Sequence, residues 1–167
     1  MNPFTYRLEA PADASAIEAI HAEVFGPGRY ARAAFRLREG VPHDPALSFV
    51  AEADGKPVAS VRLTPIAIGG RPALLLGPLA VHPDYKHQGA GRQLVRIGLA
   101  AARAAGHAVV MLVGDEPYYG PLGFTRLKPY QITLPAPVDP YRVLVAGLAE
   151  GALDGLSGPA ERAAPGA

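Results

Sequence analysis

Three apolar segments separated by two tight-turn signals constrain the fold of this chain most strongly. Residues 47–53 and 56–68 flank Asp54-Gly55, the dipeptide most typical of a two-residue hairpin. Gly69-Gly70 then separates the second segment from residues 71–81. This arrangement predicts three consecutive antiparallel strands.

The last of these segments has two properties of a central strand. Leu74 to Leu76 are apolar at consecutive positions, so both faces of the strand are expected to be buried. Pro78 has no amide hydrogen to donate. We therefore expect a bulge, or a parting from a neighbouring strand, near Gly77-Pro78.

A long helix and another strand follow. Residues 89–105 place Leu94, Ile97 and Ala101 on one helical stripe, and residues 108–113 have the composition of a short buried strand. A strand, a helix and a strand in this order predict a right-handed crossover that joins a parallel pair.

Shorter elements are expected around this centre, and residues 1–150 are expected to form one domain. Residues 151–167 are rich in Gly, Ala and Pro and are predicted to be a flexible C-terminal tail. The other predicted elements are a strand at 4–8, helices ending at Phe25 and spanning 29–38, a helical turn at 118–122, and strands at 124–134 (interrupted by Pro129) and 141–148.

Composition limits the classes of function. The chain has 167 residues, and its 16 basic and 15 acidic residues give a formal net charge of +1. No overall field attracts a nucleic acid or an anionic membrane, so neither is expected as a partner. The absence of cysteine excludes disulfides, thiolate metal sites and a cysteine nucleophile. The five histidines lack metal-ligand spacing, so no metal is expected.

The N-terminal segment has no targeting signal that we can identify. Residues 1–15 include Glu9 and Asp13 and lack the continuous apolar stretch of a signal peptide. No apolar run approaches the roughly 18 residues that cross a bilayer. We therefore expect a cytoplasmic protein.

The most informative segment runs from Val81 to Leu94, where a strand, a short loop and two glycines precede the long helix. The first amides of a helix have no internal partners and carry the positive end of the helix dipole. Gly89 and Gly91 would let a bulky anion approach the backbone, and Lys86 and Arg92 add full positive charges. This pattern predicts a site for a pyrophosphate.

Two common phosphate-binding loops do not fit this segment. The NTPase loop ends in Gly-Lys-Ser/Thr, which is absent here. A dinucleotide-binding loop needs a third glycine where Leu94 stands, and its glycines follow the strand more closely. The antiparallel strands before the loop also disfavour a nucleotide-binding α/β domain.

The loop resembles the acetyl-CoA signature of the GCN5-related N-acetyltransferases (the GNAT family), Arg/Gln-x-x-Gly-x-Gly/Ala. Residues 86–91, Lys-His-Gln-Gly-Ala-Gly, follow it with lysine at the first position, and residues 79–83, Leu-Ala-Val-His-Pro, are typical of the family's fourth strand. The resemblance implies acetyl-CoA as co-substrate, with its pantetheine arm on strand backbone groups and its pyrophosphate on the loop amides. The cofactor-binding residues that it implies are Leu79, Ala80, Val81, Lys86, His87, Gln88, Gly89, Ala90, Gly91, Arg92 and Tyr119.

A second motif supports this resemblance. Residues 118–124, Tyr-Tyr-Gly-Pro-Leu-Gly-Phe, are similar to the aromatic-Tyr-x-x-x-Gly-Phe segment that follows the family's fifth strand. The order of strands and helices matches as well, over roughly residues 4–148. The resemblance implies an α/β (α+β) fold of the GNAT type: a mixed, mostly antiparallel sheet with helices on both faces and a central parallel strand pair that splays around the acyl-CoA site.

Transfer of an acetyl group to an amine requires a stabilised oxyanion and a proton or hydrogen bond for the leaving sulfur. The family's general acid corresponds to Tyr119. A phenol with a pKa near 10 would protonate a thiolate of pKa near 8.5 uphill by about 2 kcal/mol, so a hydrogen bond during bond breaking is the feasible role. The resemblance also implies that the amide of Leu79, beside the expected parting at Pro78, donates to the oxyanion.

The general base is less clearly indicated. Residues 74–81 contain no carboxylate, although many relatives place a glutamate there. Asp115 is the candidate that we assign, with Glu116 beside it. Glu23 and His43 are alternatives, and a chain of waters to bulk solvent would serve equally well.

Four arginines in the second predicted helix are open to two interpretations. Arg29, Arg32, Arg36 and Arg38 could form a solvated helix face, or they could select an acidic acceptor, because the first two helices cover the acceptor side in GNAT enzymes.

The sequence therefore predicts an acetyl-CoA-dependent N-acetyltransferase. Direct attack in a ternary complex is expected because no cysteine is available for an acyl-enzyme. The alternative is a non-catalytic acyl-CoA-binding or sensor domain, which the missing strand carboxylate favours and Tyr119 disfavours. The sequence does not specify the acceptor, which is a small-molecule or peptide amine. A homodimer is possible, because dimers are common among relatives.

Overall fold

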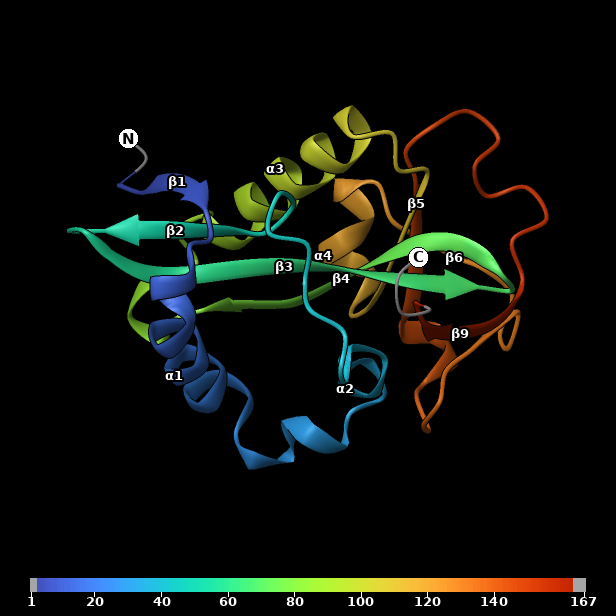
Figure 1. Ribbon diagram of the computed structural model, residues 1–167, viewed down its shortest axis with the longest axis horizontal. Helices are drawn as coiled ribbons and strands as arrows, with labels where there is room; N and C mark the ends of the chain where they lie inside the picture. The colour runs from blue at the N-terminus through green and yellow to red at the C-terminus, as the bar shows by residue number, and fades with distance from the viewer. Residues whose placement is uncertain (1–2, 164–167) are drawn as a thin grey trace.

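The computed structural model describes residues 3–163, and most of its strands lie in one twisted sheet (Figure 1). The order along the sheet is β1-β2-β3-β4-β5-β8-β6, and β9 pairs with β3 and with β7 outside that path. The strands are β1 Thr5–Leu8, β2 Phe49–Ala53, β3 Lys56–Ile68, β4 Arg71–Val81, β5 Val109–Val113, β6 Thr125–Arg126, β7 Ile132–Thr133, β8 Val143–Gly147 and β9 Gly158–Arg162.

The centre of the sheet is the predicted parallel pair. β4 and β5 are paired only at Leu74 with Val110 and at Leu75 with Met111, whereas the other pairs along the main order are antiparallel. From Leu76 onward the edge of β4 that faces β5 has no strand partner. The expected parting of strands is therefore confirmed.

The bulge lies at the same place. Val61 of β3 pairs with Leu79, but Leu63 pairs with Leu76, so β4 has one more residue than β3 between these pairs. The additional length accommodates Gly77-Pro78, whose peptide bond is cis. Pro78 cannot donate a ladder hydrogen bond, which is the physical reason for an irregularity here.

Helices cover both faces of the sheet (Figure 1). α3 packs on β2, β3 and β4 on one face, while α1 contacts β3 and β4 on the other face, where α2 also lies. Two short 3-10 turns precede α1 and α2. The helices are α1 Ala14–Phe25, α2 Ala33–Arg38, α3 Ala90–Ala104 and α4 Glu116–Tyr119.

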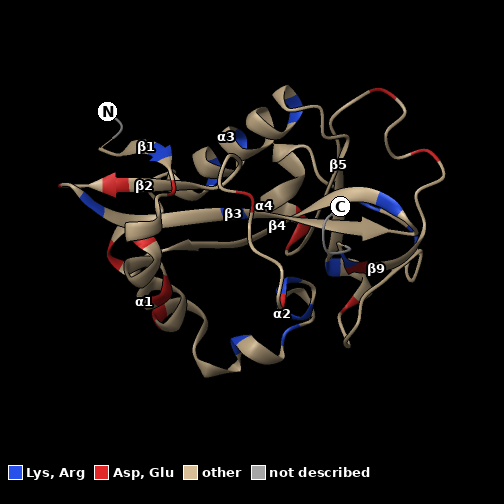
Figure 2. Cartoon of the chain, in the orientation of Figure 1, with Lys and Arg blue, Asp and Glu red and all other residues tan. Residues whose placement is uncertain are grey.

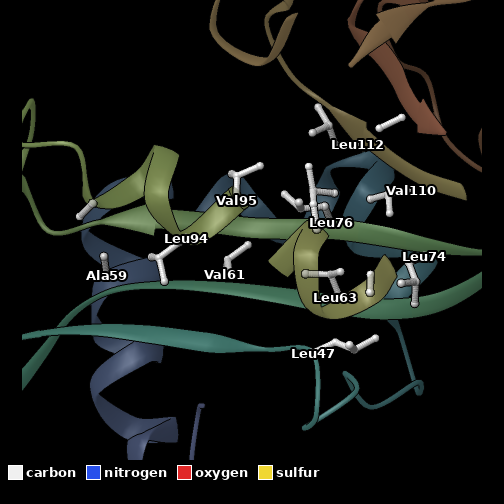
Figure 3. Close-up of a cluster of buried hydrophobic side chains, with 14 of the residues drawn as sticks. Leu47, Ala59, Val61, Leu63, Leu74, Leu76, Leu94, Val95, Val110 and Leu112 are labelled. Atoms are coloured by element: carbon white, nitrogen blue, oxygen red, sulfur yellow. The ribbon is translucent and has the colours of Figure 1, made fainter. Parts of the chain in front are cut away.

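Strand alternation divides the core between these two layers. On the α3 side, Leu94 and Val95 pack with alternate residues of three strands, among them Leu63, Leu76 and Leu112 (Figure 3). The residues between them face the other layer, where the buried cluster includes Ala73, Leu75, Val109 and Met111 together with Leu37 of α2. Leu74 to Leu76 are thus buried on both sides, as predicted.

Two predicted elements are each divided into two in the structure. Residues 124–134 do not form one interrupted strand, because β6 pairs with β8 while β7 pairs with β9. The predicted helix at 29–38 is a 3-10 turn, Pro27–Ala31, followed by α2, since Arg32 adopts an extended backbone between them.

The predicted flexible tail is wrong for residues 151–163. Leu156 is fully buried, and β9 pairs with β3 through Ile68 and Ala160. Arg71 donates to the carbonyl oxygens of Ala152 and Asp154, at 2.7 and 3.0 Å. The sheet therefore extends beyond the expected boundary at residue 150, and residues 164–167 lie outside the described part of the chain.

Among residues 3–163, no helix combines the length and the apolar character needed to cross a bilayer.

Candidate active site

A cleft of about 1330 Å³ opens where β4 and β5 part. Its walls come from both faces of the sheet. On one side lie the loop before α3, the start of α3 and the tyrosines of α4, and on the other side lie α1, α2 and the middle of β3. The gap between the two strands is thus where the two sides of the cleft meet.

The start of α3 provides free backbone donors on the first side. The first hydrogen bond of the helix that we observe runs from the amide of Gln93 to the carbonyl of Gly89, at 3.1 Å. The amides of Ala90, Gly91 and Arg92 precede it and have no partner inside the helix. Gly89 and Gly91 line the cleft there, as the sequence predicts for an anion site.

The two glycines of this loop serve different physical purposes. Gly89 has φ of +89°, in the left-handed region, and a Cβ atom there would meet nothing within 4 Å. Gly91 is buried, and a Cβ built on it would lie 2.7 Å from the Tyr118 hydroxyl. Gly89 is therefore required for its backbone conformation, whereas Gly91 is required for the close packing of Tyr118.

Charge at this end of the cleft is positive. The guanidinium of Arg92 lies 5.3 Å from the ring centre of Tyr118, and Lys86 lines the cleft with an exposed side chain. Neither cation forms an ion pair with a carboxylate within residues 3–163. Both are thus available to an anion at the helix terminus.

Tyr119 lines the cleft that opens where β4 and β5 part. Its ring makes edge contacts with Tyr118 and Phe124, with ring centres 4.8 and 5.9 Å away, and a Cβ on Gly114 would lie 2.5 Å from it. Burial raises the pKa of the Tyr119 phenol well above its usual value near 10. The hydroxyl therefore remains protonated at neutral pH and can donate a hydrogen bond.

Leu79 lies on β4 beyond the parting. It pairs with Val61 of β3 on one side, and no strand pairs with it on the side of β5. Its side chain packs with the core of the α3 layer and lines the cleft, as does that of Val81. Ala80 between them is buried and does not line the cleft.

The carboxylates near the fifth strand lie at the rim. Asp115 lines the cleft with its side chain 73 % exposed and accepts a hydrogen bond from Nε of Arg142 at 3.1 Å. Glu116 pairs with Arg126 at 3.2 Å and does not line the cleft. Glu23 is exposed on α1, also away from the cleft.

His43 is the alternative base that the structure places deepest. It lines the cleft, and its Nε2 lies 3.3 Å from Oε2 of the buried Glu9. Glu9 accepts two hydrogen bonds from Arg62, both at 2.9 Å. Burial lowers the pKa of the His43 imidazole below its usual 6.5, although Glu9 acts in the opposite direction, so the ring is neutral at neutral pH.

His21 and Arg38 belong to the same side of the cleft. His21 is 4 % exposed, and its Nε2 has no hydrogen-bond partner in the described part of the chain. Burial, reinforced by Arg62, lowers the pKa of His21 to about 4. Arg38 reaches towards β4, because a Cβ on Gly77 would lie 3.7 Å from its Nη1.

Within residues 3–163, no three acidic or histidine side chains gather as a metal site would require.

Comparison with known proteins identifies the scaffold. An acetyltransferase (GNAT) domain family matches residues 44–126. The uncharacterized N-acetyltransferase YhbS of Escherichia coli K12 is 32 % identical over 155 residues, which cover 91 % of this chain and 92 % of that protein. The chain belongs to the GNAT family. It is accordingly an N-acetyltransferase, as the sequence predicts.

Solved GNAT structures agree with the fold. YhbS from E. coli in complex with CoA superposes with a TM-score of 0.82 at 30 % identity, over 98 % of this chain and 91 % of that one. A GNAT family acetyltransferase from Brucella melitensis in complex with acetyl-CoA gives a TM-score of 0.71 at 28 % identity, over 98 % of both chains. The predicted fold class is confirmed.

The GNAT motifs located the α3 side of the cleft, whereas on the other side the sequence offered His43 and three of the lining arginines only as alternatives. The structure brings together the predicted Leu79, Val81, Gly91 and Tyr119, whereas Asp115 is at the rim. Sequence reasoning did not connect Glu9 with Arg62 and His43, since 53 residues separate the first two. The available signal was the charged Arg62 within a mostly apolar strand.

Proposed function

We propose that the protein transfers the acetyl group of acetyl-CoA directly to an amine bound on the α1 and α2 side of the cleft. The amine nitrogen attacks the thioester carbonyl, the C–N bond forms, the C–S bond breaks, and the amine loses one proton while CoA leaves as the thiol. The observation that carries this proposal is that the parting of β4 and β5 and the free amides of α3 border the same cleft.

Acetyl-CoA would lie along the first side of the cleft. Amides at the start of α3, with Lys86 and Arg92, suit the pyrophosphate. The unpaired edge of β4 at Leu79 to Val81 suits the amides and carbonyls of a pantetheine arm, because an exposed strand edge presents backbone donors and acceptors. Ala80 would contribute through its backbone alone, since its side chain is buried away from the cleft.

Two groups would stabilise charge during the transfer. The amide of Leu79 is the oxyanion donor that we propose, since it follows the irregularity at Pro78 and β5 does not pair with it. Tyr119 would donate a hydrogen bond to the departing sulfur. Its raised pKa makes a full proton transfer more costly than for a free phenol, so the role is a hydrogen-bond donor.

The proton of the amine requires an acceptor on the opposite side. Asp115 was the candidate from the sequence, but its exposed carboxylate is engaged by Arg142. His43 is better supported, because it is neutral, lines the cleft and is positioned by the buried Glu9. We therefore propose His43 as the base, with Asp115 to be tested beside it.

Calorimetry of the protein with acetyl-CoA tests the first part of this proposal. The variant Gly89→Glu places a negative charge in the loop, and Gly89→Ala is the matched control, because both impose the same strain at φ of +89°. We expect micromolar binding by the wild-type protein, moderate weakening in Gly89→Ala and loss of binding in Gly89→Glu. A folded wild-type protein that does not bind acetyl-CoA would refute the proposal.

A further inference from the structure

The side of the cleft opposite α3 has an excess of positive charge. We define the acceptor chamber as the cleft residues contributed by α1, α2, the segments next to them and β3. Figure 2 shows Lys and Arg along α2 and the segment before it. The polar members of the chamber are Glu18, His21, Arg29, Tyr30, Arg32, Arg38, His43, Arg62 and Thr64.

Two of the four arginines are already neutralised by carboxylates. Arg29 lies 2.9 Å from Glu18, and Arg62 lies 2.9 Å from Glu9. Arg32 and Arg38 have no carboxylate or hydrogen-bond partner in residues 3–163, and they lie instead beside the rings of Phe25 and Phe35, respectively. The chamber therefore has two positive charges without partners.

Arg38 is the more significant of the two. It is partly buried, whereas Arg32 is exposed. Burial, with Arg62 and Arg32 nearby, lowers the pKa of Arg38 to about 10, so it stays charged at neutral pH. A desolvated guanidinium without an anion is unfavourable, and an incoming anion would remove that cost.

Arg38 lies close to the part of β4 where we propose that the acetyl transfer takes place. Its Nη1 lies beside Gly77, two residues before Leu79 on β4. Arg62 lies between two β3 residues that face α3, so its side chain points to the opposite layer, across from Gly77-Pro78. Two residues of strand span roughly 6–7 Å, so a group bound at Arg38 is a few bonds from an amine at the thioester.

His21 lies next to Arg38 in the same chamber, close enough to be influenced by its charge. Its side chain is buried in the wall of the same chamber, and Nε2 has no partner within the described residues. A neutral imidazole can donate or accept a hydrogen bond through this atom. Nε2 is itself closed to solvent, so an anion in the chamber would act on the His21 imidazole through its charge, as Arg38 does, and not through a direct hydrogen bond.

We propose that the acceptor is a small anionic amine, whose carboxylate or phosphate binds Arg38 while its amino group meets the thioester. This inference rests on the proposed function and specifies its substrate class. The exposed Arg32 would attract the acceptor to the chamber. Cationic amines such as polyamines would be repelled by the same charges.

CoA release from acetyl-CoA tests the class of acceptor. The panel is the twenty amino acids as free acids and as amides, with phosphoethanolamine and spermidine. We expect at least one amine with an anionic group to be acetylated with kcat/KM tenfold or more above its amide, which lacks the anionic group, or above spermidine. The amide has the less basic amine, so intrinsic reactivity acts against this result. A preference for spermidine or for the amides would overturn the inference while leaving the acetyltransferase function intact.

Variants of two arginines on α2 test whether Arg38 causes the preference for anionic acceptors. Arg38→Met is expected to raise KM for the anionic acceptor at least tenfold and to abolish the preference over the amide, with the Kd of acetyl-CoA unchanged. Arg36→Met is the matched control, because Arg36 is exposed on the same helix, pairs with Glu39 at 3.7 Å and does not line the cleft. Equal preferences in the two variants would overturn the role of Arg38.

A binding measurement decides the matter if no amine in the panel reacts. With CoA saturating the loop at α3, inorganic phosphate is titrated while the imidazole signals of His21 are followed by NMR, assigned with a His21→Asn variant. We expect a saturable shift in the wild-type protein and in Arg36→Met, and none in Arg38→Met. No shift in the wild-type protein would refute an anion site at Arg38.

Discussion

The hydroxyl of Tyr118 lies where a side chain on Gly91 would begin, since a Cβ there would be 2.7 Å from that oxygen. Val81 of β4 is 3.4 Å from the same point. The second glycine of the loop therefore allows a tyrosine of α4 to pack against the start of α3. This contact links the two sequence motifs physically.

Gly91→Ala should displace the Tyr118 ring, and because the helix propensity of alanine offsets part of that cost, the fold should lose at most about 1 kcal/mol. Tyr118→Phe removes the oxygen that clashes, so the double variant should recover part of the loss. Urea unfolding of the two single variants and the double variant measures this coupling. Strictly additive effects would show that the contact does not matter for stability.

Tyr119→Phe should lower kcat about 100-fold, because a hydrogen bond to the leaving sulfur is made only as the C–S bond breaks. The Kd of acetyl-CoA should change little. Tyr118→Phe is the matched control, since its hydroxyl lies at Gly91 beside the helix. Equal losses of kcat in the two variants, measured by CoA release, would contradict a specific role for Tyr119.

The bounds of β3 and β4 were predictable to the residue because their signals are local. β3 and β4 have the bounds that Asp54-Gly55 and Gly69-Gly70 set, and Pro78 marked the parting of the strands. Turn dipeptides and a missing amide hydrogen act through neighbouring residues, so one sequence is sufficient to reveal them.

The acceptor chamber is formed by residues that are far apart in the sequence, so its members were not predictable in detail from the sequence alone. Arg36 and Arg38 are two residues apart in one arginine-rich segment, but only Arg38 lies in the cleft. The buried pairing of Glu9 with Arg62 joins residues 53 apart. Local composition cannot distinguish a solvated arginine from a buried one, so these assignments required the structure.

The pH dependence of kcat should report the His43 imidazole. Its pKa is lowered, so the ring is neutral above pH 6.5 and becomes protonated only at more acidic pH. Protonation removes the proposed base, so kcat should fall as the pH decreases through a value below 6.5. His43→Gln should lose about 100-fold in kcat and lack this acidic limb. Asp115→Asn should retain it, and loss of the limb in that variant instead would identify Asp115 as the base.

The buried His21 should make stability depend on pH. Its pKa is about 4 in the folded state and about 6.5 when unfolded, so the unfolded chain binds more protons between these values. The free energy of unfolding should therefore fall as the pH decreases from 6.5 to 4, by at most about 3 kcal/mol. Urea unfolding of His21→Asn across this range should show a smaller decrease, and an unchanged slope would contradict the assignment.

The segment after residue 150 should contribute to stability, contrary to its composition. Leu156 is fully buried in the cluster that contains Ile68, Met111 and Val145, and β9 follows it along the edge of β3. Leu156→Ala should cost about 2–5 kcal/mol, because the cavity can collapse only partly. Glu161→Ala on the exposed side of β9 is the control and should change stability by less than about 0.5 kcal/mol. Thermal unfolding that is equal for the two variants would mean that this strand adds little to the domain.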